Sequence, residues 1–340
     1  MLDRTVISSR GAPRLRRRVS NTDLSNPGSY IALAIVLGTV LTNPVATNAS
    51  TSPALGQAIV VWQGKGGTPL SGPTGVAVDV RHGEIVVANT AAHRIEFFDL
   101  SGRPLGALVH RVAEPRGAYV EGQPRTLALD RAGHLLVSDN LASYVDVLDF
   151  FGRSITRLRP FEGQPGAGGP GALAVDAAGT IYVASSGDSG RIVRYSPEYE
   201  PLPGWGLPGR EAGQLCQITG LAFAPDGRAV VTCVGTQFGI QVFDASGRYV
   251  TGFGLHELGP ENISFPSGVA VTGDGRIWIT DATRQTVQVY DLTGRYLGTC
   301  GQGGDAPGDF YFPSAVASDG ADLLAIAERV GSRLQLFRVR

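Results

Sequence analysis

The chain has 340 residues, including 47 glycines and 21 prolines, and 43% of its residues are hydrophobic. Its formal net charge is −1, and 29 residues are basic, of which Lys65 is the one lysine. This composition favours many short strands joined by turns over long helices. Residues 50–340 contain no run of basic residues, which argues against a nucleic-acid-binding protein.

The first 49 residues have the order of a secretory signal. A basic region around Arg14–Arg18 precedes the apolar run Ile31–Leu41, and small residues surround Ala49. The apolar run has eleven residues, whereas a helix that spans a bilayer needs about 20. We therefore predict a signal peptide over 1–49, export to the periplasm or beyond the cell, and no membrane span in the mature form. An uncleaved anchor is the alternative.

Residues 50–340 contain a repeat. An apolar segment with a small central residue recurs at intervals of 51, 46, 48, 48 and 47 residues. Its copies read GVAVD, TLALD, ALAVD, GLAFA, GVAVT and AVASD, centred on Ala77, Ala128, Ala174, Ala222, Ala270 and Ala317. Apolar residues on both faces of a strand indicate that a neighbouring sheet packs on each side. Repeats of this length predict the blades of a propeller.

Each copy continues through three further strands separated by turns. VTGDGRIWITD, TVQVYD, LTG and RYLGTCG show this pattern in the fifth copy. The fold class is therefore all-β, a six-bladed β-propeller of four-stranded antiparallel blades that start near 72, 123, 169, 217, 265 and 312. The last copy ends before a fourth strand, so we predict that residues 57–64 close the ring from the N-terminal side.

The third strands carry a family likeness. ANTAAHRIEFFDLSG in blade one resembles the N-x-R-I-x-x-F-D motif of NHL repeats, and FGIQVFDASG, QTVQVYDLTG and GSRLQLF echo it in blades four to six. Blade three, with RIVRYSPEYE, lacks the Asp and the Gly turn. The resemblance covers residues 57–340 and implies a propeller, while the family includes enzymes, receptor ectodomains and adaptor surfaces.

The resemblance also allows two metal sites to be tested. In the related peptidyl-amidating lyases, histidines just before several first strands hold a metal, which needs about three or four such ligands. The corresponding positions here hold no histidine: Thr74, Arg125, Gly171, Thr219, Ser267 and Ser314. Gluconolactonase-like propellers carry an acidic ligand where this chain has Ser71. We predict neither a metal nor another cofactor.

A binding face is predicted where second strands end. Arg125 at the channel mouth is suited to a planar carboxylate, or it pairs with an acid such as Asp139 or with backbone carbonyls. The turns on the same face carry polar residues, which either form a rim for a partner or cap turns. These residues are Asn89, Asp139, Asn140, Asp281, Glu328 and Arg329.

The three cysteines lack metal or nucleophile contexts. Cys216 enters the first strand of blade four and Cys233 ends its second strand, so these two form the candidate disulfide, with Cys300 buried or free. The five histidines share no repeat position that would aim them at one point, and no catalytic residue is predicted.

These patterns together indicate an exported, non-catalytic and monomeric propeller that binds a protein, a peptide or a component of the cell envelope. The alternative is a propeller hydrolase or lyase, related to lactonases or amidating lyases, with an atypical site at the channel mouth around Arg125 and nearby acids.

Overall fold

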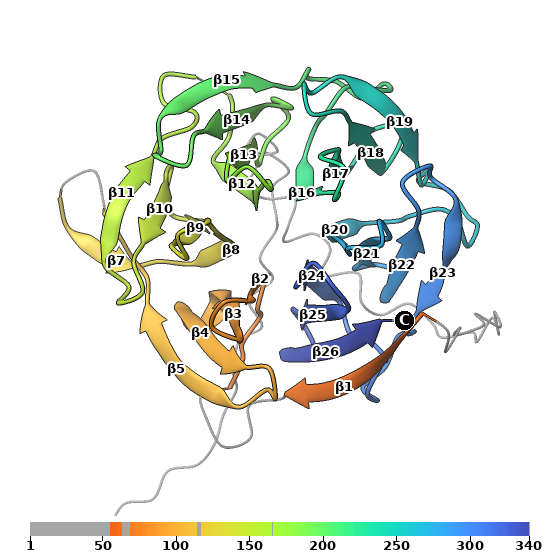
Figure 1. The fold of residues 1–340 in the computed structure, drawn as a ribbon, viewed down its shortest axis with the longest axis horizontal. Coiled ribbons are helices and arrows are strands. Elements are labelled where there is room, and N and C mark those ends of the chain that lie inside the picture. The colour runs from red at the N-terminus through yellow and green to blue at the C-terminus, as the bar shows by residue number, and fades with distance from the viewer. Residues whose placement is uncertain (1–54, 63–68, 114–116, 165, 340) are drawn as a thin grey trace, which may run out of the picture. The chain divides into compact units, whose positions relative to one another are not determined.

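The computed structural model describes residues 55–62, 69–113, 117–164 and 166–339. They form six four-stranded antiparallel sheets arranged as blades around a central channel (Figure 1). This confirms the predicted six-bladed β-propeller. The predicted signal peptide lies outside the described residues.

The blades follow one another along the chain. Blade one consists of β2 (Gly75–Asp79), β3 (Glu84–Asn89), β4 (Arg94–Asp99) and β5 (Pro104–Val109). Blade two consists of β8 (Pro124–Leu129), β9 (Leu135–Asp139), β10 (Val145–Leu148) and β11 (Ser154–Leu158). Blade three consists of β12 (Pro170–Val175), β13 (Ile181–Ser185), β14 (Ile192–Tyr195) and β15 (Pro201–Trp205). Blade four consists of β16 (Ile218–Phe223), β17 (Ala229–Cys233), β18 (Ile240–Phe243) and β19 (Tyr249–Phe253). Blade five consists of β20 (Pro266–Val271), β21 (Ile277–Asp281), β22 (Thr286–Tyr290) and β23 (Tyr296–Cys300). Blade six consists of β24 (Pro313–Ser318), β25 (Leu323–Glu328), β26 (Arg333–Val339) and β1 (Gly56–Trp62).

The fourth strand of blade six comes from the other end of the described chain. β1 pairs antiparallel with β26, with Gly56 opposite Val339 and Trp62 opposite Leu334. The strand at the start of the ring therefore completes the blade at its end.

The core lies between blades. Each of six clusters of buried hydrophobic side chains joins two neighbouring blades. Val76 and Ile85 of blade one, for example, pack with Leu336 of blade six, while Ala77 packs with Leu127 of blade two. This arrangement explains why the first strands are apolar on both faces.

Two local elements depart from the repeat. A short hairpin of β6 (Arg111–Ala113) and β7 (Tyr119–Glu121) lies between blades one and two and was not predicted. A 3-10 turn at Thr90–Ala92 follows β3. No helix in the part of the chain that the structure describes is long and apolar enough to cross a membrane.

In four blades, the turn between the third and fourth strands has the same hydrogen-bonded frame. Asp-x-x-Gly-Arg occurs at 99–103, 149–153, 244–248 and 291–295. In each, one oxygen of the aspartate accepts hydrogen bonds from the backbone N–H groups two and four residues later, and the other pairs with the arginine. The Ser101 hydroxyl and these N–H groups lower the pKa of Asp99 to about 2.

Candidate functional site

Four of the predicted rim residues, three acids and one of the two amides, are buried. Asn89, Asp139, Asp281 and Glu328 end the second strands of four blades, and each side chain is at most 3% exposed. They form no part of an exposed rim. Their position at the strand ends is as predicted, but they point into the loops that enter their own blades.

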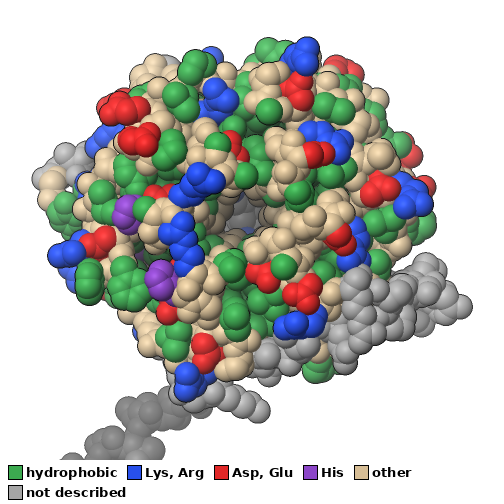
Figure 2. Space-filling model, in the orientation of Figure 1, with side chains coloured by type: hydrophobic (Ala, Val, Ile, Leu, Met, Phe, Trp, Pro, Cys, Tyr) green, Lys and Arg blue, Asp and Glu red, His purple; other side chains and the backbone are tan. Residues whose placement is uncertain are grey.

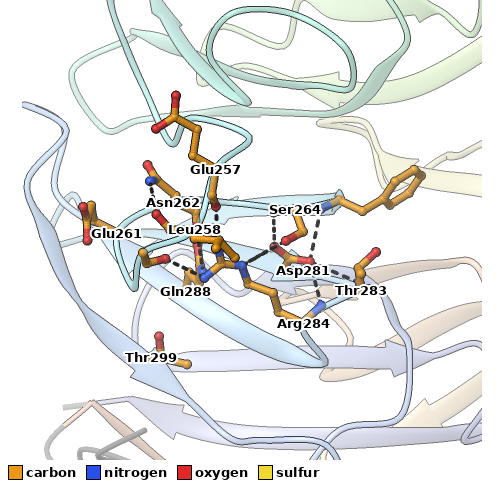
Figure 3. A network of polar contacts seen from close by, with 12 residues as sticks. Glu257, Leu258, Glu261, Asn262, Ser264, Asp281, Thr283, Arg284, Gln288 and Thr299 are labelled. Atoms are coloured by element: carbon orange, nitrogen blue, oxygen red, sulfur yellow. Dashed lines mark hydrogen bonds and ion pairs between the residues drawn. The ribbon is translucent and has the colours of Figure 1, made fainter. Parts of the chain in front are cut away.

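Asp281 shows what these side chains do (Figure 3). Its carboxylate accepts hydrogen bonds from the backbone N–H groups of Ser264 (2.6 Å) and Phe265 (3.2 Å) in the loop that leads into blade five. The N–H groups of Thr283 and Arg284 bond to the same carboxylate at 3.1 and 3.0 Å. One buried side chain thus holds both the inter-blade loop and its own turn.

The corresponding residues of blades six and one make similar contacts. Glu328 accepts hydrogen bonds from the Tyr311 N–H and the Gln335 amide, both at 2.6 Å, and pairs with buried Arg333 at 2.5 Å. Asn89 accepts from the Ser71 N–H at 2.7 Å. Burial raises the pKa of Glu328, although its hydrogen bonds oppose the shift.

In blade two the same place holds a buried charge cluster. Nδ1 of His110 lies 2.8 Å from Asp139 Oδ2, and Nε2 lies 3.5 Å from Asp146 Oδ2. Burial lowers the pKa of His110, but the two carboxylates outweigh it and raise the pKa above 6.5. Gly122 passes so close that a β-carbon there would lie 2.2 Å from Asp139 Oδ2.

Sequence reasoning missed the third-strand partners of these residues. Each lies in a buried third strand and contacts either the inter-blade loop or the acid or amide at the end of the second strand. They are Glu96, Asp146, Gln241, Gln288 and Gln335. The available signal was a Glu, Asp or Gln at one repeat position between apolar neighbours, as in RIEFFD, TVQVYD and RLQLF.

Hydroxyl groups join neighbouring blades at the channel mouth. Thr74 Oγ1 donates to the Arg125 carbonyl at 2.9 Å. Ser267 and Ser314 donate to the carbonyls of Pro313 and Pro73, both at 2.7 Å. Three of the six positions compared with the metal-binding histidines of the amidating lyases thus carry hydroxyls that connect blades. Among the described residues, no group of three His, Cys, Asp or Glu side chains is arranged to hold a metal ion.

Arg125 and Arg329 lie at the same mouth. Arg125 is half-buried at the start of β8, and Arg329 is exposed after β25, as Asn140 is after β9. Burial and the nearby Arg329 guanidinium lower the pKa of Arg125. Within the described residues neither arginine forms an ion pair, and the candidate partner Asp139 is bound to His110.

The candidate disulfide is not formed. Cys216, Cys233 and Cys300 are free and buried. The Cys216 thiol donates instead to the Val234 carbonyl at 3.4 Å. Burial raises the pKa of Cys233 and of Cys300 to about 12.

The repeat motif decides the family. The model of the NHL repeat matches residues 70–98 and 264–290, the first three strands of blades one and five. The chain is an NHL-repeat β-propeller. These are two of the blades in which the sequence resembles the motif most closely. No curated protein is similar enough in sequence to count as a match.

Solved structures share the propeller at low identity. A virginiamycin B lyase from Staphylococcus aureus is 13% identical, with a TM-score of 0.55 over 83% of this chain and 99% of that one. A gluconolactonase from Xanthomonas campestris is 17% identical, with a TM-score of 0.61 over 79% and 86%. An aldose sugar dehydrogenase from Streptomyces coelicolor, bound to PQQ, is 19% identical, with a TM-score of 0.55 over 85% and 99%. At these identities the likeness concerns the fold alone.

Proposed function

We propose that this NHL-repeat propeller is an exported binding protein whose channel mouth receives a carboxylate of a peptide, a protein or an envelope component. The observation that carries this proposal is the pair of arginines, Arg125 and Arg329, that have no acidic partner among the residues that the structure describes. Two like charges at one mouth repel each other, and an anion between them would relieve that repulsion.

The chemistry of the mouth fits a carboxylate. A guanidinium group offers a planar fork that matches a carboxylate bidentately. Asp281 and Glu328 end neighbouring second strands, but their oxygens hold backbone and side-chain donors and do not compete for the arginines. The hydroxyls of Thr74 and Ser314 already donate to backbone carbonyls. The donors that remain for a carboxylate at this mouth are therefore the guanidinium groups of the two arginines.

The proposal is tested by thermal unfolding in a series of mono-, di- and tricarboxylates, with acetate, succinate and citrate as probes. A ligand that binds the folded state raises the melting temperature as its concentration exceeds the dissociation constant. We expect a rise in the wild type and in Arg295→Gln, whose exposed arginine pairs with Asp291 in a turn. We expect none in Arg125→Gln.

Arg125→Gln also separates a binding role from a structural one. If the arginine serves a ligand, its removal relieves the repulsion from Arg329, and the unliganded variant is at least as stable as the wild type. An equal response of Arg125→Gln to the carboxylates, or a marked loss of its stability, would contradict the proposal. Conversion of a carboxylate ester or lactone by wild type, lost in Arg125→Gln, would favour the enzyme alternative.

A further inference from the structure

Two adjacent phenylalanines project from the turn between β10 and β11. Phe150 and Phe151 are 71% and 77% exposed. Their rings meet edge to face at 5.8 Å, so they form one apolar tip. This turn follows the end of β10 that lies away from Arg125, so the tip belongs to the opposite face of the ring from the channel mouth.

The tip replaces a hydrogen bond that other blades keep. In the three other Asp-x-x-Gly-Arg turns the third residue is Ser101, Ser246 or Thr293, and its hydroxyl donates to the aspartate at 2.5 to 2.6 Å. Phe151 occupies this position and keeps the backbone frame of Asp149 without a hydroxyl. Blade two therefore gives up a turn-stabilising contact and exposes an aromatic ring, which folding alone does not explain.

The surroundings of the tip are apolar and basic. The His82 ring lies 5.7 Å from Phe150, and Val80, on the β2–β3 turn that also carries His82, is 65% exposed. The guanidinium of Arg153 lies 5.0 Å from the centre of the Phe151 ring. Figure 2 shows histidine and hydrophobic side chains together over blades one and two, with arginine between them and the central opening.

On this surface the arginine side chains are more exposed than the carboxylates with which they pair. The Arg103 and Arg153 side chains are each 75% exposed, whereas their partners Asp99 and Asp149 are 23% and 21% exposed. Arg81 is exposed and has no ion-pair partner in the described part of the chain. In both of these pairs the guanidinium group is outermost and the carboxylate lies beneath it, and Glu84, the nearby acid at the start of β3, is half-buried.

We propose that the surface formed by Val80, Arg81, His82, Phe150, Phe151 and Arg153 docks onto a bilayer that carries anionic headgroups. Both rings protrude, with 71% of Phe150 and 77% of Phe151 exposed. A bilayer interface accepts a protruding aromatic without a matching socket, and anionic headgroups complement the outer arginines.

The test places a reporter at the tip. In the full chain, Phe151→Trp is mixed with vesicles of phosphatidylcholine that contain phosphatidylglycerol and brominated acyl chains. Ser246→Trp, in the equivalent turn of blade four, is the matched control, because any attachment through the N-terminal segment affects both variants alike. Each is compared with the wild type to subtract the native tryptophans.

We expect quenching of the tryptophan at 151, weaker quenching at 246, and little quenching at 151 on purely phosphatidylcholine vesicles. Arg81→Gln should lower the affinity for anionic vesicles about fivefold. Phe151→Ser removes the exposed ring and restores the turn hydroxyl. Its affinity for anionic vesicles, measured by competition with Phe151→Trp, should therefore fall about tenfold, while its melting temperature should be no lower than that of the wild type. A folded Phe151→Trp that stays unquenched, equal quenching at both positions, or equal quenching on neutral vesicles overturns the proposal; the first result would leave the tip to an acidic protein.

Discussion

Replacing Asp281 with alanine tests whether the buried residues at the ends of the second strands hold the ring together. The carboxylate is fully buried and accepts four backbone N–H groups at 2.6 to 3.2 Å. A hydrogen bond to a charged group contributes about 1.5–3 kcal/mol, and several such bonds to one carboxylate are not additive. We therefore expect Asp281→Ala to lower the free energy of unfolding by about 3–5 kcal/mol.

The assay is equilibrium unfolding in urea at neutral pH, with Asp291→Ala as the matched control. Asp291 also accepts backbone N–H groups, but its side chain is 28% exposed, so water replaces the lost contacts. That substitution should lower the free energy of unfolding by about 1 kcal/mol. If Asp281→Ala costs no more than Asp291→Ala, the interpretation of Asp281 as a loop anchor is wrong.

Three further predictions concern blade two and metal content. Because the pKa of His110 is raised, the protonated ring stabilises the fold fully below pH 6.5; this stability should be lost as pH rises through the higher folded-state pKa, and thermal unfolding should show a weaker loss in His110→Gln. In Gly122→Ala the new β-carbon would lie 2.2 Å from Asp139 Oδ2, so this substitution should lower the free energy of unfolding by about 1–3 kcal/mol. In the control Gly106→Ala, in β5, the new β-carbon would have no atom within 4 Å, so the change in stability should be close to zero. Equal urea midpoints for the two variants would contradict the close approach at Gly122. Elemental analysis of protein purified without chelator or metal-affinity tag should find no stoichiometric metal, and its presence would favour the enzyme alternative.

The architecture was predictable because it is repeated. The apolar segments centred on Ala77, Ala128 and their equivalents set the period, and the predicted blade starts lie within three residues of the observed first strands. Six copies of one pattern leave few arrangements that bury both faces of each first strand. The β6–β7 hairpin occurs once, so no repeat could indicate it.

The roles of the polar residues were not predictable in the same way. A polar side chain at a strand end indicates an exposed turn equally well, and the inter-blade partners of Asp281 and Glu328 are N–H groups of loop residues 16 and 17 positions earlier. Backbone donors leave no mark on the sequence. For Arg125 the sequence left open an ion pair with Asp139, which the insertion of His110 prevents. That insertion depends on the unrepeated segment between blades one and two.

The pairing of β1 with β26 also sets an order of events during synthesis. The first strand of the ring emerges from the ribosome long before Arg333–Val339, its partner, has been made. Blade six can therefore be completed, and packed against blades one and five, only after β26 has been made. Until then β1 has no partner strand within the ring, and a nascent chain that stops short of β26 carries an open edge that can pair with other chains.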